Sequence, residues 1–209
     1  MPLSEVISTQ SNSKIYVWKI EESFKVLQQQ VALTAGSLER LNSMKSVLQQ
    51  RAFLSVRMIL QQVGYTDQDL FYDALGKPHL QDGTFISITH SHHFAAVILS
   101  DVPVGIDMEL QREKIIRIAN KFCETEFQYL NIEDVDYIRK LTVIWGVKEA
   151  IFKIKSEKGI SFKDHISVFL INLELAQTGA QLHFYDVKQD FKVYFKEIEG
   201  FTLVYAFEN

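Results

Sequence analysis

The sequence predicts an α+β protein of two similar subdomains in a pseudo-twofold arrangement, each with a long helix packed on a mainly antiparallel sheet. Three observations favour this class. Two long segments have the apolar spacing of a helix, several short β-prone runs are separated by turn residues, and strands and helices do not alternate strictly as they do in a doubly wound parallel sheet. A division at the turn near Asp101 gives an N-terminal subdomain of residues 1–103 and a C-terminal subdomain of residues 104–209.

The N-terminal half is expected to contain one long helix and several strands. Residues 14–20 are rich in β-prone side chains and predict a strand. Apolar residues spaced by three, four or seven predict an amphipathic helix over residues 37–63, which Gly64 can end. Residues 85–89 and 94–99 read as two further strands on either side of a His-rich turn.

The C-terminal half repeats this mixture. Residues 104–110 alternate as a strand does, and residues 113–122 show helical spacing. Residues 134–155 predict the second long helix. Further strands are expected at residues 166–171, 182–187, 192–198 and 201–207.

The composition is that of an ordinary globular protein with a mildly acidic balance. Of the 209 residues, 47% are hydrophobic, which is enough apolar material for a core. The 22 Lys and Arg residues face 26 Asp and Glu residues, so the formal net charge is −4. This balance argues against attraction of the whole surface to nucleic acid or to anionic lipid. Any anionic ligand must therefore meet a local basic site.

The sequence gives no sign of a membrane or secretory protein. Its longest strictly apolar run, residues 94–99, is far shorter than the roughly 20 residues that a membrane span needs. The first residues contain neither a basic leader nor an apolar signal region, so the expected location is cytoplasmic. The single cysteine, Cys123, excludes an internal disulfide and a multi-cysteine zinc site.

An acidic pair on the strand at residues 104–110 is the first candidate for chemistry. Asp107 and Glu109 are separated by one residue, which puts both side chains on the same face of a strand. Like charges at this distance favour a bound cation, and oxygen donors without clustered thiols indicate Mg²⁺ rather than zinc. Gly105 supplies no side chain, so a bulky group can approach the backbone there. The alternative reading is a pair of solvated surface charges.

A second constellation lies on the predicted helix 134–155. Trp145, Glu149 and Lys153 recur every four residues and so share one helix face. Gly146 inside the helix indicates a close approach of backbone or ligand. Glu149 could add a third carboxylate to a Mg²⁺ site open to phosphoryl chemistry. The alternative is an ordinary Glu–Lys pair beside a core tryptophan.

Other side chains could bind phosphate through positive charge or hydrogen bonds. They are Arg51, Arg57, Lys77, His90 and Lys153. Arg51 and Arg57 lie six residues apart and do not share one helix face, so at least one of them could be a solvated or capping charge.

These segments together resemble the 4′-phosphopantetheinyl transferases of the surfactin-synthetase-activating type. The resemblance rests on residues 105–109 (GIDME) followed by residues 145–153 (WGVKEAIFK). It covers roughly residues 51–168, and the total length suits the single-chain, two-subdomain form of the family. Four intervening segments also look like family motifs: residues 76–78 (GKP), 88–91 (ITHS), 122–126 (FCETE) and 158–161 (KGIS).

The resemblance implies transfer of the 4′-phosphopantetheine arm of coenzyme A to a serine of an apo acyl or peptidyl carrier protein, with release of 3′,5′-ADP. It implies that Asp107, Glu109 and Glu149 bind Mg²⁺ on the coenzyme A diphosphate. Lys153 would hold the same diphosphate and could assist the leaving group. For the general base, Glu149 is the first choice and Glu126 the second, with a helix-surface glutamate as the alternative reading of Glu126.

The resemblance also assigns the nucleotide side of coenzyme A to the N-terminal subdomain. Positions near the phosphates or the nucleotide match Arg51, Arg57, Lys77, Thr89 and His90. Arg57 could instead be structural. The site is expected in a cleft between the halves of one chain, which favours a monomer.

Carrier proteins of this kind are acidic, so a chain with a net negative charge needs a local basic surface, such as a basic stripe, to bind them. Lys114, Arg117 and Lys121 are spaced to lie together on a helix surface beside apolar residues, and we expect them to dock an acidic carrier helix. A solvated helix face is the alternative. Two other functions stay open: a catalytically silent carrier- or coenzyme-A-binding module, and another Mg²⁺-dependent phosphoryl hydrolase.

Overall fold

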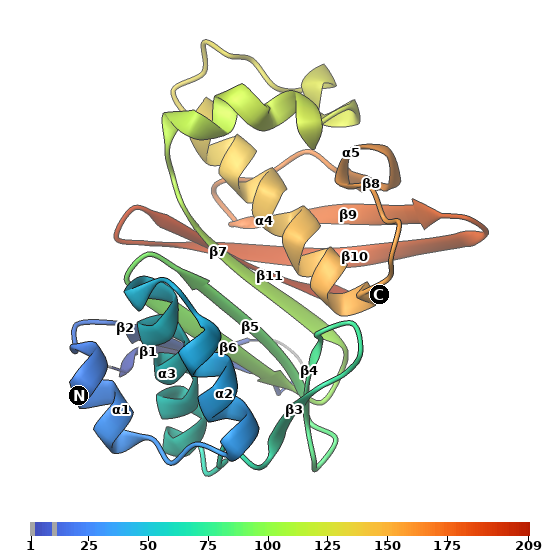
Figure 1. The fold of residues 1–209 in the computed structure, drawn as a ribbon. Coiled ribbons are helices and arrows are strands. Elements are labelled where there is room, and N and C mark those ends of the chain that lie inside the picture. Colours follow the sequence, from blue (N-terminus) through green and yellow to red (C-terminus); the bar gives the residue numbers. More distant parts are fainter. Residues whose placement is uncertain (1–2, 10–11) are drawn as a thin grey trace. The chain divides into compact units, whose positions relative to one another are not determined.

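The computed structural model describes residues 3–9 and 12–209. Met1 and Pro2, which belong to the segment searched for a signal sequence, lie outside the described residues. The chain divides into two units, residues 1–102 and 103–209. Each unit has antiparallel strands and helices packed on them, which confirms the α+β class (Figure 1). Within the described residues, no helix combines the length and apolar character needed to cross a bilayer.

The first unit is built on a four-stranded antiparallel sheet. Its strand order is β1-β2-β6-β5, and a separate two-stranded sheet pairs β3 with β4. The predicted strands in this unit are confirmed, whereas β1, β3 and β4 were not predicted. The bounds are β1 Leu3–Ser8, β2 Lys14–Lys19, β3 Leu70–Tyr72, β4 Pro78–Leu80, β5 Phe85–Ser91 and β6 Phe94–Ser100.

The predicted single helix over residues 37–63 is wrong. The structure has two helices there, α2 (Ala35–Ser43) and α3 (Val47–Gln62). The side-chain amide of Gln50 donates to the carbonyl oxygens of Leu41 and Met44, at 3.4 and 3.1 Å, and so binds the end of α2 where the chain turns. Both helices bury apolar residues in one core, so the helical spacing continues across the break. A shorter helix, α1 (Phe24–Gln30), was not predicted.

A buried ion pair joins the helices of the first unit. Arg57 on α3 donates from Nε to Oδ1 of Asp67 at 3.0 Å, and both side chains are almost completely buried. The backbone N–H and hydroxyl of Thr34 donate to Oδ2 at 2.8 and 2.9 Å, and the Ser37 hydroxyl donates to Oδ1 at 3.0 Å. The guanidinium of Arg57 also stacks over the ring of Phe53, 3.5 Å from its centroid. Asp67 therefore fixes the start of α2 against α3.

The second unit is built on a five-stranded antiparallel sheet of order β7-β11-β10-β9-β8. The strand predicted at residues 104–110 is confirmed with its bounds. The one predicted at 166–171 is only three residues long, and β9 begins five residues before the predicted position. The bounds are β7 Val104–Leu110, β8 Ile166–Val168, β9 Gln177–Phe184, β10 Val187–Ile198 and β11 Phe201–Glu208.

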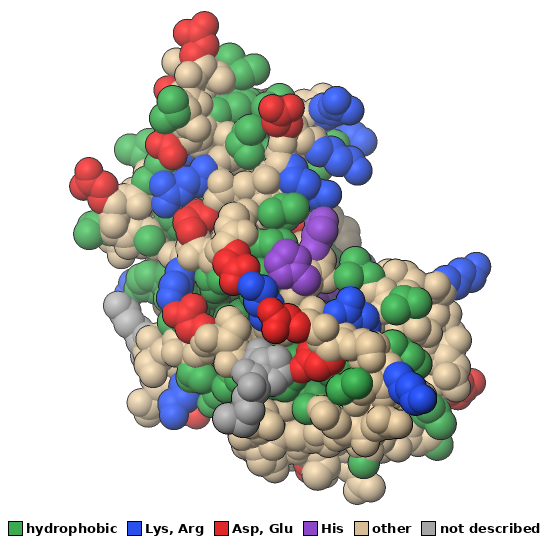
Figure 2. Space-filling model, turned by 90° about the vertical axis from the view of Figure 1, so that its left-hand side faces the viewer, with side chains coloured by type: hydrophobic (Ala, Val, Ile, Leu, Met, Phe, Trp, Pro, Cys, Tyr) green, Lys and Arg blue, Asp and Glu red, His purple; other side chains and the backbone are tan. Residues whose placement is uncertain are grey.

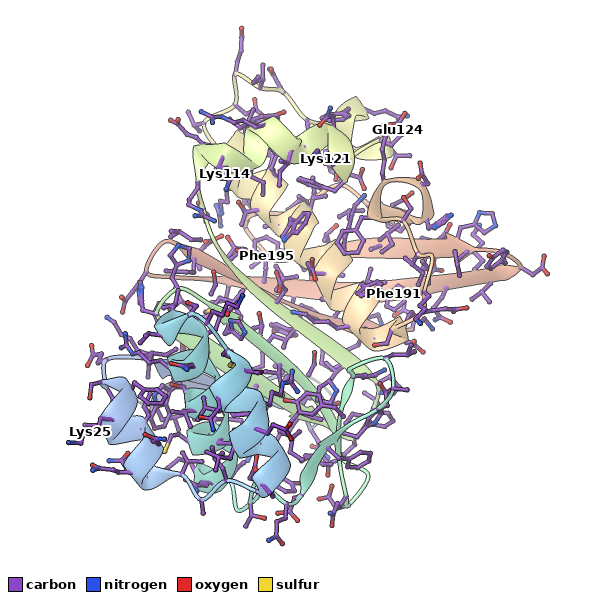
Figure 3. The ribbon with its side chains drawn as sticks, viewed as in Figure 1. Lys25, Lys114, Lys121, Glu124, Phe191 and Phe195 are labelled. Carbon is purple, nitrogen blue, oxygen red and sulfur yellow. The ribbon has the colours of Figure 1, made fainter. Side chains whose placement is uncertain are left out.

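One long helix, α4 (Tyr137–Lys155), lies across a face of this sheet (Figure 1). The helix is apolar over most of its circumference and ends at Ser156, which adopts a left-handed conformation. Its buried residues pack against inward-facing aromatic residues of β10, Phe191 and Phe195, which are labelled in Figure 3. Two short segments, η2 (Thr125–Gln128) and α5 (Phe162–His165), complete the unit.

The segment Glu113–Lys121, η1, is a 3₁₀ helix rather than the predicted α-helix. Three residues make one 3₁₀ turn, so side chains three apart stand above one another. Ile116, Ala119 and Phe122 follow this spacing, and the last two are buried. Apolar residues three apart satisfy both helix types, which explains why the pattern did not distinguish them.

Replacing Asp67 with asparagine is expected to lower the free energy of unfolding by about 3 kcal/mol at neutral pH, because the buried charge of Arg57 loses its partner. Burial raises the pKa of Asp67, but hydrogen bonds from Thr34, Ser37 and Arg57 outweigh it, so the pKa lies below its ordinary value. A lowered folded pKa gives stability that is present above the unfolded pKa and is lost as pH falls through the folded pKa. Urea unfolding of both proteins should therefore show the difference shrinking below about pH 4.

Glu174→Gln is the matched control, because Glu174 is an exposed acid in the other unit. It should change the unfolding midpoint little at any pH. A loss in Asp67→Asn that stays constant across the pH range would contradict the assigned role of the carboxylate.

Candidate active site

Strand β7 brings the predicted acidic pair to the face of the sheet that α4 covers. Asp107 pairs in register with Val204 of β11, and its Oδ2 atom is buried near Gly146 of α4. Glu109 follows two residues further on the same face and is partly exposed. On the opposite face Ile106 and Met108 are fully buried, which fixes the direction of the strand.

Two glycines allow α4 to approach the sheet closely. A Cβ atom on Gly105 would lie 1.9 Å from the carbonyl oxygen of Ala150, so the helix backbone occupies the space of that side chain. A Cβ atom on Gly146 would lie 2.6 Å from a methyl carbon of Val204. The close approach predicted at Gly105 is confirmed, and the neighbour is the backbone of α4. At Gly146 the approach is also close, but the neighbour is the side chain of Val204 rather than the predicted backbone or ligand.

This close packing brings residues of the two motifs together. The Lys153 ammonium donates to Oδ1 of Asp107 at 2.8 Å and to the carbonyl oxygen of Ile106 at 2.8 Å. Glu149 lies one helical turn before Lys153 and is partly buried. The predicted Glu149–Lys153 face of the helix is therefore directed to the strand that carries Asp107.

The electrostatics of this cluster are unbalanced. Burial raises the pKa of Glu149, the negative charge of Asp107 raises it further, and the positive charge of Lys153 lowers it only in part. Asp107 thus accepts a hydrogen bond from Lys153, and Glu149 lies close enough to both groups for their charges to act on it. Such a cluster favours a further positive charge.

The carboxylates do not form a closed metal cage by themselves. Among residues 3–9 and 12–209, no three His, Cys, Asp or Glu side chains converge in an arrangement that could hold a metal ion. Asp107 is bonded to Lys153, and Glu109 lines a neighbouring groove of about 200 Å³. The three-carboxylate Mg²⁺ set therefore stays a prediction.

Glu126 is not a surface residue. Its side chain is fully buried, and Oε1 lies 2.8 Å from the ammonium of Lys148, which is also fully buried. The helix-surface reading of Glu126 is wrong, because backbone N–H groups of Glu124 and Val168 also donate to its carboxylate. An incoming serine could not reach this carboxylate without breaking the network, so the structure does not favour Glu126 as the base.

Of the five predicted phosphate-binding residues in the first unit, the two arginines bind other groups of the same unit. Arg51 donates to the carbonyl oxygens of Ile20 and Glu22, both at 2.8 Å. Arg57 is the buried partner of Asp67, so its structural reading is confirmed. The other three lie at strand ends or turns: Lys77 is partly exposed after Gly76, Thr89 is buried on β5, and His90 on the same strand is exposed.

Sequence reasoning missed two residues near the candidate site. Lys148 lies inside the motif of residues 145–153, one position before Glu149, but was given no role; its inward-facing position among apolar neighbours was the available signal. Arg112 lines the same groove as Glu109, and only the three-dimensional contact reveals it.

These features define an α+β domain in which an acidic pair on a strand faces an acid and a lysine on a helix. Residues 103–206, nearly the whole second unit, match the family model of the 4′-phosphopantetheinyl transferase superfamily. The match supports the superfamily and a transferase of this kind, and it does not distinguish the surfactin-synthetase-activating type. No curated protein matches the chain significantly.

Gly105→Ala is expected to lower the free energy of unfolding by about 3 kcal/mol, because the new methyl group collides with the backbone of Ala150 rather than with a flexible side chain. The measurement is urea unfolding of the purified protein. Gly36→Ala is the control: Gly36 lies in α2 with open space around it, so alanine should be neutral or slightly stabilising. Equal stability of Gly105→Ala and the unmodified protein would contradict the packing described above.

Proposed function

We propose that the protein transfers the 4′-phosphopantetheine arm of coenzyme A to a serine of an apo acyl or peptidyl carrier protein. In this reaction the serine oxygen forms a bond to the phosphorus that bears the pantetheine, the bridging P–O bond breaks, and 3′,5′-ADP leaves. The observation that carries the proposal is the cluster of Asp107, Glu149 and Lys153, built from two motifs inside the superfamily match.

Mg²⁺ is the metal ion of the proposal. The residues fit it, because all donors are carboxylate oxygens, and Mg²⁺ needs only one or two protein carboxylates beside water and phosphate oxygens. Burial, and after it the negative charge of Asp107, raise the pKa of Glu149, so a cation beside the two carboxylates would be favourable. Asp107, Glu149 and Glu109 would hold the ion. When bound, it would neutralise charge on the diphosphate.

Lys153 is proposed to bind the diphosphate. An ammonium group has three N–H donors, and two of them go to Asp107 and Ile106 within the described chain. The side chain is 27% exposed, so a phosphate oxygen can approach the third donor. A cation held at this place stabilises negative charge on the departing 3′,5′-ADP.

Glu149 is proposed as the group that accepts the proton of the carrier serine. A carboxylate whose pKa is raised by burial and by a neighbouring acid holds a proton more readily than an exposed one. It is only partly buried, unlike Glu126. The resemblance further suggests that Arg51, Lys77, Thr89 and His90 bind the nucleotide side of coenzyme A; Arg57 is left out because it pairs with Asp67.

The carrier is proposed to dock beside η1. Both apolar and basic side chains line the groove that contains Glu109. Its other lining residues are Leu110, Arg112, Lys114, Ile115, Ile118 and Trp145. An acidic helix with apolar side chains would complement such a surface in both charge and polarity.

The 3₁₀ geometry changes the predicted basic stripe. Lys114 and Arg117 are three residues apart and share one side of η1, whereas Lys121 is rotated away by about one third of a turn. All three are exposed, and Figure 3 labels Lys114 and Lys121 on this segment. In Figure 2, a group of basic side chains lies at the upper right of the face shown, with acidic side chains close by. Local basic groups can thus attract an acidic partner to a chain of net charge −4.

Intact mass spectrometry of an apo carrier protein tests the proposed reaction. After incubation with the protein, coenzyme A and Mg²⁺, the carrier should gain one phosphopantetheine arm. Glu149→Gln should lower the rate by at least about 100-fold, because it removes a charged oxygen donor and the proton acceptor. Removal of the metal should also abolish transfer.

Glu157→Gln, an exposed acid just after α4, serves as control and should act like the unmodified protein. Coenzyme A consumed without a modified carrier would instead favour the hydrolase. Coenzyme A bound without any turnover, across several carriers, would favour the silent binding module.

Charge reversal tests the docking surface. Lys114→Glu combined with Arg117→Glu should raise the KM for the carrier about tenfold or more, with a smaller effect at high salt, and leave the KM for coenzyme A unchanged. Lys25→Glu combined with Lys45→Glu is the control, because it changes the net charge equally on exposed residues of the first unit. Wild-type carrier kinetics in the η1 variant would exclude this surface.

A further inference from the structure

A buried ion pair lies directly behind the candidate active site. Lys148 of α4 and Glu126 of η2 are both fully buried, with Nζ 2.8 Å from Oε1. The ammonium also donates to the carbonyl oxygens of Phe122 and Phe162, at 2.6 and 3.0 Å. Its three N–H donors therefore have three acceptors.

Both oxygens of the Glu126 carboxylate also accept hydrogen bonds. Beside Lys148, the N–H of Val168 donates to Oε1 at 2.8 Å, and the N–H of Glu124 donates to Oε2 at 3.0 Å. The pair thus connects α4 to the segment after η1, to α5 and to strand β8. No other ion pair among the described residues has both side chains fully buried.

A buried ion pair of this kind contributes little net free energy to the stability of a core. Removing two charges from water costs free energy that their attraction often fails to return, and apolar residues of similar volume usually serve stability as well. What a charged, fully hydrogen-bonded pair adds is direction, because each donor must meet its acceptor at a fixed distance and angle.

Here that direction bears on the candidate active site. Consecutive residues of an α-helix point about 100° apart, so fixing Lys148 fixes the direction of Glu149. The close contact between Gly105 and Ala150 sets the distance of the helix from β7, but a contact at the helix backbone leaves rotation about the helix axis less restricted. Aromatic edges of Phe122 and Phe162 pack against Trp145, one turn earlier, and support the same setting.

We propose that Lys148 and Glu126 form a positioning pair that sets the rotation of α4 and so aims Glu149 at Asp107. This role rests on the proposed function, because it concerns the carboxylates that would hold the metal ion and accept the serine proton. Neither residue of the pair touches substrate. Their effect reaches the reaction through Glu149.

The test compares folding stability, metal binding and catalysis in the same variants. Lys148→Met and Glu126→Leu alone should each unfold at much lower urea concentration, because one buried charge remains without its partner. The double variant should regain most of the stability lost in the single variants. Its kcat should nevertheless stay at least tenfold below wild type, with the KM for the carrier unchanged.

Direct metal binding gives a readout apart from activity. Mn²⁺ is titrated into the protein with coenzyme A present, and free Mn²⁺ is followed by electron paramagnetic resonance. The double variant should bind Mn²⁺ about tenfold more weakly than wild type. Lys155→Met is the control, because it removes another ion pair of α4, with Glu208, that is partly exposed; it should leave kcat and Mn²⁺ affinity unchanged.

The outcomes separate the two hypotheses. A stable double variant with wild-type kcat and Mn²⁺ affinity would overturn the positioning role while the transferase stands. If the double variant does not fold, Glu126→Asp decides: it keeps the charge but shortens the side chain, and wild-type kcat and Mn²⁺ affinity in this variant would equally overturn the role. Wild-type protein that neither binds Mn²⁺ with coenzyme A nor modifies a carrier would contradict the proposed function itself.

Discussion

The close approach of α4 to strands β7 and β11 is the constraint on which the second unit depends. It is possible only because Gly105 and Gly146 lack side chains at the two points of contact, with Ala150 and with Val204. The carboxylate of Asp107 and the ammonium of Lys153 meet across this contact. Side chains at these two points would move the helix away from the sheet, and with it Lys153 away from Asp107.

The same unit shows two uses of buried charge. Asp107, Glu149 and Lys153 form a cluster with more acid than base, in which burial and mutual repulsion raise the pKa of Glu149. Lys148 and Glu126, by contrast, form a balanced pair whose donors and acceptors are all used. The unbalanced cluster is suited to binding a further cation and an anionic substrate. The balanced pair is suited to holding helices and strands in fixed positions. Adjacent positions of one helix, Lys148 and Glu149, thus belong to two different electrostatic systems.

Much of the candidate site could be predicted because its residues belong to local patterns. Alternation on a strand places Asp107 and Glu109 on one face, and a spacing of four on a helix does the same for Glu149 and Lys153. Their ion pair across β7 and α4 needed the fold. Arg57 could not be assigned from local patterns, because nothing in its sequence neighbourhood distinguishes a phosphate-binding arginine from a partner of Asp67. Asp67 follows ten residues later, and the fold brings the two side chains together.

The sequence by itself determined the α+β class, strand β7, the long helix α4, and the motifs that resemble the 4′-phosphopantetheinyl transferase superfamily, because each follows from short-range periodicity or from residues close together in the chain. The tertiary structure decided the break between α2 and α3, the 3₁₀ form of η1, the burial of Glu126 with Lys148, and the pairing of Lys153 with Asp107. Apolar spacing of three or four is satisfied by continuous helices, broken helices and 3₁₀ turns alike, so only packing selects among them. The partner of a charged side chain is likewise chosen by which elements meet in space.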